Sequence, residues 1–275
     1  MNIISVDLED WFDLGFAEKE IARQKNNFSE PIVVRDTLVL LSVFKKYNIR
    51  ATFFILGRLA KEYPDLVRQV AQDGHEIASH GYNHLPIARS NPNNFDEDIK
   101  KSLEAISKLT QDQIIGYRAP HLSLRDYWAY DILSKNGFLY DSSLKFPLAH
   151  LDWKAKEDYY ALSLKDGKEI LEFPVSSINF LGRRIAFSGG AYFRMLPKLL
   201  IKKCIENINN KGLAAHIYLH PRDVAKSLPS LRLSFANQLR YSGRSGDTLE
   251  KLEYLLANFK FGALKMKLEG RATYD

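Results

Sequence analysis

Two histidines, His80 and His84, have the spacing in this chain that most clearly indicates chemistry. They follow a short apolar segment, Ile77-Ala78, and an acidic cluster, Asp7-Leu8-Glu9-Asp10, follows another apolar segment near the N-terminus. Two neutral imidazole nitrogens and one carboxylate make a three-ligand metal site with room for a water, which is the arrangement of a hydrolytic metal centre. The sequence therefore predicts a bound divalent metal ion and a hydrolase.

The acidic cluster offers more carboxylates than the metal alone requires. A metal-dependent hydrolase needs one carboxylate on the ion and another that takes a proton from the attacking water. Along an extended strand Asp7 and Glu9 face one way and Asp10 the other, although a strand end often twists out of this alternation. A solvated loop after an edge strand is the alternative interpretation of this cluster.

The histidine pair is expected in a loop or a single turn, because Gly81 lies between the two rings and Leu85-Pro86 follows them. Two surface histidines near a turn are the alternative. A zincin helix requires the pattern His-Glu-x-x-His. Here His75-Glu76 is followed by His80, one residue too far along, so that family is disfavoured and Glu76 is expected in the wall of the sheet or behind the metal ligands.

Two further residues follow apolar segments and could take part in catalysis. Arg118, in Tyr117-Arg118-Ala119-Pro120, can hold a carboxylate in its ionised form through a two-pronged contact. His220, in Tyr218-Leu219-His220-Pro221, is a candidate acid for protonating a departing amine. A surface arginine before a proline turn and a structural histidine are the alternatives.

Short apolar segments alternate with longer amphipathic stretches along most of the chain, which indicates alternating strands and helices. We expect strands at 3–6, 51–56, 75–78, 114–117, 138–140, 171–175, 214–219 and 261–264, and helices at 33–47, 58–72, 96–109 (capped by Asn94), 126–135, 197–209 and 248–258. This order favours an α/β fold with a closed or nearly closed parallel sheet and helices outside it. The candidate residues follow strand ends, and active sites lie at the carboxyl end of such barrels. The segment from Phe146 to Lys168 is expected to be a surface excursion, and residues 1–275 to form a single domain.

Composition restricts the class of protein further. The chain has 275 residues, of which 45% are hydrophobic and 26% charged, as in soluble globular proteins. No segment approaches the roughly 18 consecutive apolar residues of a membrane span, and the N-terminus lacks the basic start of a secretory signal. A cytoplasmic location is therefore expected. The single cysteine, Cys204, excludes an internal disulfide and is expected to be buried.

The formal net charge of +6 favours an anionic partner, such as a nucleotide-linked or lipid-phosphate-linked sugar or an acidic membrane surface. Basic residues are scattered and are not interleaved with aromatic residues, so no nucleic-acid partner is expected. The sequence gives no oligomeric state.

Together these motifs resemble those of the polysaccharide deacetylases of the NodB-homology class (carbohydrate esterase family 4), in particular a branch whose first motif reads Val-Asp-x-Glu-Asp. The matching segments, which span roughly residues 3 to 222 in the order of the family, are 6–12, 79–84, 117–120, 140–143, 188–194 and 218–221.

The resemblance implies a distorted (β/α)7-type barrel that removes N-acetyl groups from amino sugars with one divalent metal ion, Zn²⁺ by preference and otherwise Ni²⁺ or Co²⁺. Residue by residue, Asp7 is similar to the catalytic base, His80 and His84 to metal ligands, Arg118 to the residue that orients the base, and His220 to the acid. Tyr82, or a backbone N–H beside it, would help to stabilise the oxyanion. Trp11, Phe12 and Tyr192 are suited to stacking on a sugar.

The first motif departs from the commonest form of the family, which has two adjacent aspartates, because here Leu8 follows Asp7. The carboxylate ligand is then Glu9 or Asp10. We favour Asp10, and an alignment with Glu9 as the base stays open.

The expected substrate is an amino sugar in a bacterial surface polysaccharide such as O-antigen, or in its nucleotide- or lipid-linked precursor, with peripheral contact to a lipid-linked glycan. One alternative is a deformylase or a cyclic-amide (allantoinase-like) hydrolase on the same barrel. Another is a non-catalytic sugar-binding relative, against which the complete set of acidic, histidine and arginine residues argues.

Overall fold

The fold of the chain is known from a computed structural model that describes residues 1–24, 31–145, 148, 150–155, 158–180, 183–244 and 246–269. Its main sheet has the strand order β11-β1-β2-β3-β4-β5-β8-β7-β6, in which the pairs from β11 to β8 are parallel and the last two are antiparallel. The strands on this path are β1 (Asn2–Leu8), β2 (Thr52–Ile55), β3 (Glu76–Ser79), β4 (Gly116–Tyr117), β5 (Tyr140–Asp141), β6 (Trp153–Ala155), β7 (Tyr160–Ser163), β8 (Glu169–Glu172) and β11 (His216–Leu219). A further strand, β12 (Phe261–Gly262), pairs with the start of β1. A separate antiparallel hairpin is formed by β9 (Ser177–Phe180) and β10 (Arg183–Ala186).

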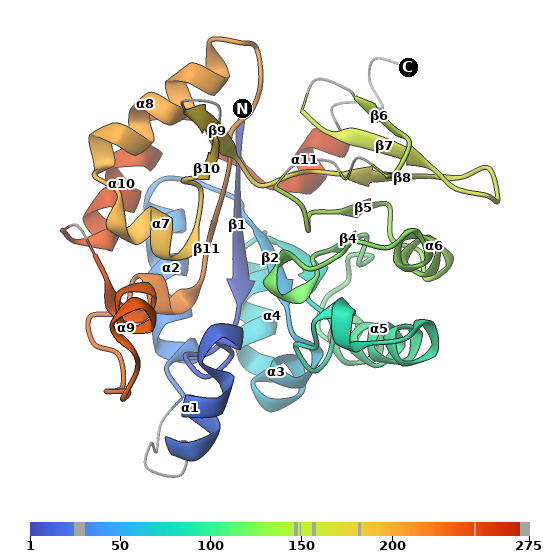
Figure 1. The fold of residues 1–275 in the computed structure, drawn as a ribbon, viewed down its shortest axis with the longest axis horizontal. Helices are drawn as coiled ribbons and strands as arrows, with labels where there is room; N and C mark the ends of the chain where they lie inside the picture. Colours follow the sequence, from blue (N-terminus) through green and yellow to red (C-terminus); the bar gives the residue numbers. More distant parts are fainter. Residues whose placement is uncertain are drawn as a thin grey trace.

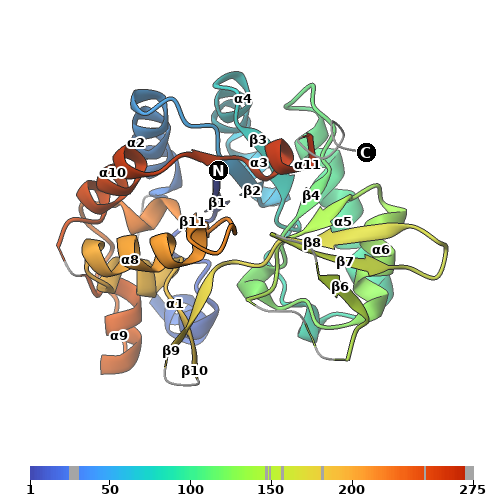
Figure 2. The ribbon, with the colours of Figure 1, turned by 90° about the horizontal axis from the view of Figure 1, so that it is seen from above.

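Helices surround this curved sheet, as Figures 1 and 2 show. They are α1 (Glu18–Gln24), α2 (Val33–Lys46), α3 (Gly57–Glu62), α4 (Pro64–Gln72), α5 (Pro92–Ser107), α6 (Tyr127–Lys135), α7 (Gly190–Met195), α8 (Lys198–Asn209), α9 (Phe235–Ser242), α10 (Thr248–Asn258) and α11 (Leu264–Glu269).

The predicted α/β fold with a distorted (β/α)7-type barrel is confirmed, although strand pairing does not close the sheet. Within the described ranges, β8 and β11 are not paired with each other. The chain that leaves β8 bridges them instead, because Ser176 N–H donates to the carbonyl of His216 at 3.1 Å and His216 N–H donates to Ser176 Oγ at 2.8 Å. Farther along β11, Tyr218 N–H donates to the carbonyl of Ser188 at 2.9 Å.

Alternation along β1 divides the core into two parts. Ile4, Val6 and Leu8 point outward and join the large apolar cluster formed with the helices. Ile3 points inward and packs with Phe54 and other side chains inside the barrel. The inward positions that follow Ile3 along the strand are polar, so the interior changes from apolar to polar toward the carboxyl end.

The expected strands are all present, with bounds shifted by a few residues, and two of the expected helices differ. The helix expected at 58–72 is split into α3 and α4 at Pro64, which lacks the N–H needed inside a helix but suits the first turn of α4. The helix expected at 96–109 begins earlier, at Pro92, because Asn91 rather than Asn94 is its cap and accepts from Asn94 N–H at 2.9 Å.

The segment expected as a surface excursion, Phe146 to Lys168, contains β6 and β7, which extend the sheet beyond β8. Residues 146, 147, 149, 156 and 157 of this segment lie outside the described residues. Cys204 is buried in α8, as expected, and burial raises the pKa of its thiol. In the part of the chain that the structure covers, no helix is both long enough and apolar enough to cross a bilayer.

Glu76 lies in the wall of the barrel, as expected from the sequence, and closes its amino end. Its carboxylate accepts hydrogen bonds from Thr52 Oγ1 at 2.6 Å, from Tyr140 OH at 2.7 Å and from Lys265 N–H at 2.8 Å. The last contact attaches α11 across the amino ends of the strands. Burial raises the pKa of Glu76, and these donors offset part of the rise.

We predict that Glu76→Ala lowers the free energy of unfolding by about 2–4 kcal/mol, because it leaves three donors without this acceptor, two of them buried. Urea unfolding of the purified chain measures this change. Glu104→Ala is the matched control, since Glu104 is exposed on α5 and its ion pair with Lys108, just after that helix, is exposed too. Equal stabilities of the two variants would contradict the role assigned to Glu76.

Candidate active site

Six of the predicted functional residues, Asp7, Glu9, His80, His84, Arg118 and His220, lie at or just beyond the carboxyl ends of parallel strands, as expected. Figure 1 shows the arrangement of these strands. Asp7 and Glu9 come from the end of β1 and the residue after it, whereas His80, Arg118 and His220 directly follow β3, β4 and β11. All six side chains are buried. Their burial makes the interactions between their charges strong, because little water screens them.

Glu9, His80 and His84 form a group whose ligand atoms lie within 4.8 Å of one another. Glu9 Oε1 is 2.9 Å from His80 Nε2 and 2.8 Å from His84 Nε2. His80 Nδ1 lies 2.7 Å from the backbone carbonyl of Arg118, so this nitrogen carries the proton that is donated. Such a contact fixes the ring and leaves Nε2 for a metal ion.

The residues of this group suit a divalent metal ion. Two imidazole nitrogens and one carboxylate oxygen are the donor set of catalytic zinc sites. Both nitrogens face the same carboxylate oxygen, an arrangement that a shared cation stabilises. Burial alone would raise the pKa of Glu9, but the charges of His84 and His220 and the hydrogen bonds of His80 and His84 outweigh it and hold the pKa well below its usual value.

Asp10, the residue favoured as the carboxylate ligand, is not part of this group. Its carboxylate faces away from the barrel and accepts from the N–H groups of Trp11 at 2.7 Å, Ile32 at 3.1 Å and Val33 at 3.4 Å. The last two belong to the N-terminus of α2, where a negative charge is stabilised by the helix dipole. The preference for Asp10 is therefore corrected in favour of Glu9, the other candidate.

Arg118 is fully buried inside the barrel and pairs with Asp7. Its Nη1 donates to Asp7 Oδ1 at 2.6 Å and to Ser5 Oγ at 3.0 Å. Its other nitrogens donate to the carbonyl and the hydroxyl of Ser142 and face His216 Nε2 at 3.1 Å. The contact with Asp7 thus uses one nitrogen only, unlike the two-pronged contact that the sequence suggested. Asp7 Oδ2 takes no part in it.

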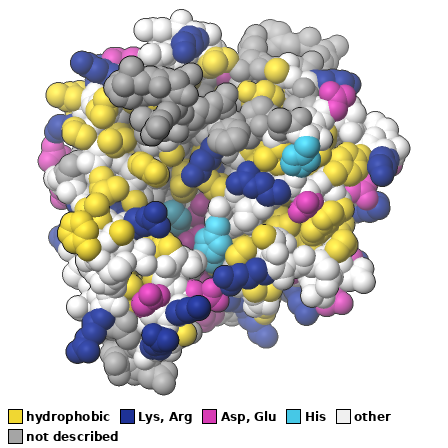
Figure 3. All heavy atoms as spheres, viewed as in Figure 1, with side chains coloured by type: hydrophobic (Ala, Val, Ile, Leu, Met, Phe, Trp, Pro, Cys, Tyr) yellow, Lys and Arg dark blue, Asp and Glu magenta, His cyan; other side chains and the backbone are white. Residues whose placement is uncertain are grey.

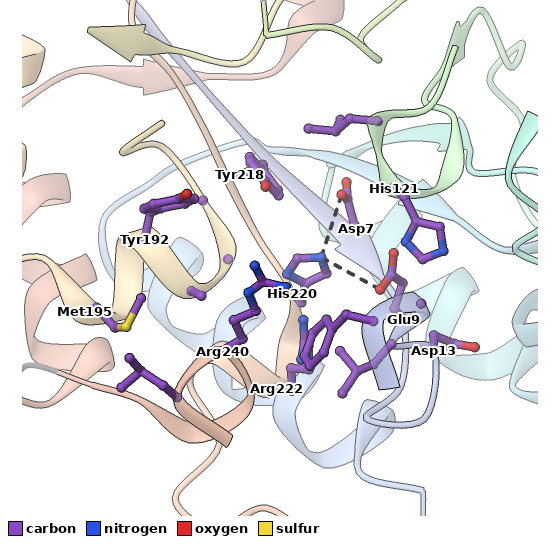
Figure 4. Close-up of a pocket in the computed structure, with 18 of the residues that line it drawn as sticks. Asp7, Glu9, Asp13, His121, Tyr192, Met195, Tyr218, His220, Arg222 and Arg240 are labelled. Atoms are coloured by element: carbon purple, nitrogen blue, oxygen red, sulfur yellow. Dashed lines mark ion pairs between the residues drawn. The ribbon is translucent and has the colours of Figure 1, made fainter. Parts of the chain in front are cut away.

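His220 lies opposite the two carboxylates (Figure 4). Its Nε2 is 3.9 Å from Asp7 Oδ2 and 3.7 Å from Glu9 Oε2, and its Nδ1 is 3.1 Å from Asp223 Oδ2. Burial by itself would lower the pKa of His220, but the charges of Glu9 and Asp223 and the hydrogen bond to Asp223 raise it overall. The ring is therefore stabilised in the protonated form that can act as an acid.

Asp223 was missed by sequence reasoning, although it follows His220 by three residues. It accepts from His220 N–H at 2.8 Å and pairs with the buried Arg194. Burial alone would raise the pKa of Asp223, but the charges of Arg194 and His220 lower it far more. Asp223 therefore fixes both the position and the charge of the His220 ring.

His121 was also missed, and it lies beside the metal-ligand group. Its ring centroid is 4.5 Å from that of His84. Both histidines have positive φ, 58° for His121 and 60° for His84, a conformation that costs energy for residues other than glycine. Burial and the charge of His84 lower the pKa of His121 to about 4. No sequence signal distinguishes it from a loop histidine.

A cavity of about 500 Å³ opens above these residues. Asp7, Glu9 and His220 line it, together with residues from the loop after β1 and from α7 and α9. Figure 3 shows histidine and acidic side chains gathered in a hollow near the middle of this face. The site is therefore accessible to a substrate.

The aromatic residues considered for sugar stacking differ in their positions. Tyr192 is half exposed and lines the cavity, whereas Trp11 is buried in a separate apolar cluster and Phe12 packs edge-on against it. Tyr82, considered for the oxyanion, lines a different hollow, and its N–H donates to Asp98 at 2.7 Å. The suggested oxyanion role of Tyr82 is therefore not supported.

Comparison with known families gives two adjoining matches. Residues 34–140 match the family described as "Polysaccharide deacetylase", and residues 145–269 match a "Domain of unknown function (DUF3473)". The chain is 37% identical over 112 residues to a peptidoglycan deacetylase of Helicobacter pylori, and this match covers 38% of this chain and 36% of that protein. It is 32% identical over 97 residues to a chitooligosaccharide deacetylase of Rhizobium leguminosarum bv. trifolii, and this match covers 35% of this chain and 43% of that protein. These matches span less than half the length of either relative.

Solved structures show the same fold over nearly the whole chain. A protein from Mycobacterium smegmatis, described as a candidate polysaccharide deacetylase, has a TM-score of 0.63 at 22% identity and covers 99% of this chain and 92% of that one. An allantoinase called Puue has a TM-score of 0.60 at 16% identity and covers 94% and 85%. BA3943 from Bacillus anthracis, described as a pseudoenzyme, has a TM-score of 0.51 at 12% identity and covers 97% and 64%.

We predict that Glu9→Gln loses stoichiometric metal, whereas Asp10→Asn keeps it, because only Glu9 faces the histidines. Asp10→Asn should instead lower the free energy of unfolding by about 1–2 kcal/mol, since it weakens the contacts with the N-terminus of α2. Elemental analysis and urea unfolding of both variants measure these effects. Loss of metal from Asp10→Asn, with metal retained by Glu9→Gln, would instead identify Asp10 as the carboxylate ligand.

Proposed function

We propose that this chain, which belongs through residues 34–140 to the polysaccharide deacetylases of the NodB-homology class (carbohydrate esterase family 4), is a metal-dependent hydrolase that removes an N-acetyl group from an amino sugar. The observation that carries this proposal is that Glu9 belongs both to the group formed with His80 and His84 and to the group formed with Asp7 and His220, and that Asp7, Glu9 and His220 line one cavity. BA3943 has the same fold and is described as a pseudoenzyme, so the fold by itself does not support catalytic activity. The support for an enzyme comes from the acidic and histidine residues of the site.

The proposed substrate is an amino sugar in a bacterial surface polysaccharide or in its nucleotide- or lipid-linked precursor, which the enzyme would meet in the cytoplasm. The names of the relatives, a peptidoglycan deacetylase and a chitooligosaccharide deacetylase, support a glycan substrate. We also propose that residues 1–275 form a single catalytic domain. Strands from both matched regions lie in one sheet, which supports this proposal.

Glu9, His80 and His84 would hold the metal ion, with Zn²⁺ as the first choice and Ni²⁺ or Co²⁺ as alternatives. When bound there, the ion supplies Lewis acidity to the acyl oxygen and lowers the pKa of the attacking water toward about 7.

Asp7 acts as the general base in the proposed mechanism. Arg118 binds its Oδ1, so the other carboxylate oxygen, Oδ2, is directed toward His220 and the cavity. This oxygen takes the proton of the attacking water. Ser5 and Ser142 hold Arg118 in turn, which fixes the direction in which Asp7 points.

His220 acts as the general acid on the opposite side. Asp223 binds its Nδ1, so Nε2 carries the proton that is given to the departing amine nitrogen. The Nε2 atom lies less than 4 Å from the carboxylate oxygens of Asp7 and Glu9, which permits both proton transfers around one acyl group.

Acetate release from amino-sugar oligomers and from nucleotide-linked amino sugars tests the reaction class, and formate release and cyclic-amide cleavage test the alternatives. The fold similarity to Puue allantoinase makes the last of these a necessary comparison. Turnover of none of these substrates by metal-loaded protein would overturn the proposal in favour of a sugar-binding role.

We predict that Asp7→Asn lowers kcat by about 10²- to 10⁴-fold, because an amide cannot accept the proton of the water. The variant should keep its metal, since Asp7 is absent from the group that contains both candidate ligand histidines. Asp65→Asn, an exposed change on α4, is the control that should retain activity. Loss of metal from Asp7→Asn would assign Asp7 to the ligands instead.

We predict that Asp223→Asn lowers kcat by about 10- to 100-fold with little change in KM, because it frees the ring of the acid while leaving the cavity intact. Asp223 is a positioning residue, so Asp223→Glu should recover part of the rate. The two variants are compared well below their unfolding temperatures, since Asp223 also pairs with buried Arg194. A change in KM alone would contradict this role.

A further inference from the structure

Arg222 is a buried cation whose side chain is incompletely satisfied. It lines the catalytic cavity, and its Nε and Nη1 atoms are buried without a hydrogen-bond partner. No ion pair joins it to a carboxylate among the described residues. Asp223, its neighbour in the chain, is engaged by Arg194 and His220. Two buried guanidinium groups thus lie near one carboxylate, and the ion pair is formed by Arg194, not by Arg222.

This arrangement is unfavourable for the folded chain on its own. A buried charge is normally paired and fully hydrogen-bonded, because the loss of water around it is costly. Consistent with this cost, burial lowers the pKa of Arg222. An uncompensated positive charge at the wall of a cavity attracts an anion, and the attraction is strong where water is excluded.

Two exposed cations line the same cavity. Neither Arg240 nor Lys145 forms an ion pair with a carboxylate within the described part of the chain. The acidic residues of the cavity are already engaged, since Asp7 pairs with Arg118, Glu9 contacts His80 and His84, and Asp13 pairs with Arg58. In Figure 4, Arg222 and Arg240 lie on the same side of the cavity as His220, and Arg240 extends toward that ring.

We infer that the substrate is an anionic amino sugar, whose phosphate or carboxylate group binds on the His220 side of the cavity beside Arg222 and Arg240. Arg240 is exposed and contacts the phosphate or carboxylate group of the sugar directly, whereas Arg222 supplies a fixed positive charge behind Arg240. Guanidinium groups suit both phosphate and carboxylate oxygens. This inference rests on the proposed function, and it names the class of substrate that the same site selects.

Binding to the metal-loaded Asp7→Asn variant tests this inference without consuming the ligand. Calorimetry compares N-acetylglucosamine with N-acetylglucosamine 1-phosphate and with N-acetylmuramic acid, which differ in the presence and type of the anion. We expect at least one anionic sugar to bind about tenfold or more tightly than the neutral one, and the advantage to shrink as salt increases. The anion with the larger advantage identifies the substituent. Equal affinities for all three sugars would overturn the inference.

Two variants in the same background identify the residues responsible. Arg240→Gln should remove most of the anion advantage, whereas Arg244→Gln, an exposed change that does not line the cavity, should not. Arg222→Met should also reduce the advantage and should raise Tm, because an apolar side chain of similar length replaces an unpaired buried charge. A structural role of Arg222 predicts the opposite, a lower Tm with the preference intact.

The controls separate this inference from the proposed function. An anion advantage that survives both Arg240→Gln and Arg222→Met would show that the oxyanion binds the metal ion itself, and would overturn the inference. Acetate release by the wild-type chain without any preference for anionic sugars would overturn the inference and leave the deacetylase proposal standing. Suppose instead that the variants lose the preference for anionic sugars and the wild-type chain releases no acyl group. This result would support the inference and overturn the deacetylase proposal.

Discussion

The buried guanidinium of Arg118 is the constraint on which the rest of the site depends. It binds side chains from the end of β5 and from within β1 and β11, and its own carbonyl fixes the ring of His80. One residue therefore sets the direction of the proposed base and of a proposed metal ligand. Because breaking a buried charge pair costs about 3–5 kcal/mol, the orientation of these groups is part of the stability of the fold. The same contacts of Arg118 therefore stabilise the barrel interior and orient the side chains of the candidate active site.

The sequence predicted the positions of the chemistry better than the identity of each ligand. Residues after strand ends converged because the carboxyl ends of parallel strands meet at one edge. Alternation along β1 put Asp7 and Glu9 on one side and Asp10 on the other, and the group formed by Glu9, His80 and His84 agrees with this alternation and not with the preference for Asp10. Two of the three backbone N–H groups that bind Asp10 are 22 and 23 residues away, and no local pattern indicates them.

Other features depend on loops, where sequence periodicity gives no information. Asp223 is three residues from His220, but only the tight turn after β11 brings it to the ring nitrogen. His121 reaches His84 through a backbone conformation that the sequence does not signal. The sequence around Arg222 does not distinguish it from a surface arginine, and its burial follows from the turn after β11. By contrast, the long amphipathic helices and most strand positions were predictable, because their periodic patterns reflect burial on one face.

The unpaired side of β11 has a consequence for the motion of the site. β1, β2 and β3 are each hydrogen-bonded to a strand on both sides, and Glu9 and His80 lie beyond the ends of two of these strands. Among the described strands, β11 is paired with β1, and its other side is attached by isolated contacts to Ser176 and Ser188 and by a single parallel bridge between Tyr218 and Gly189. Amide hydrogens along this seam should exchange with solvent sooner than those of β2. Bending at this seam would therefore displace the His220 side of the cavity relative to Glu9 and His80, which follow strands hydrogen-bonded on both sides.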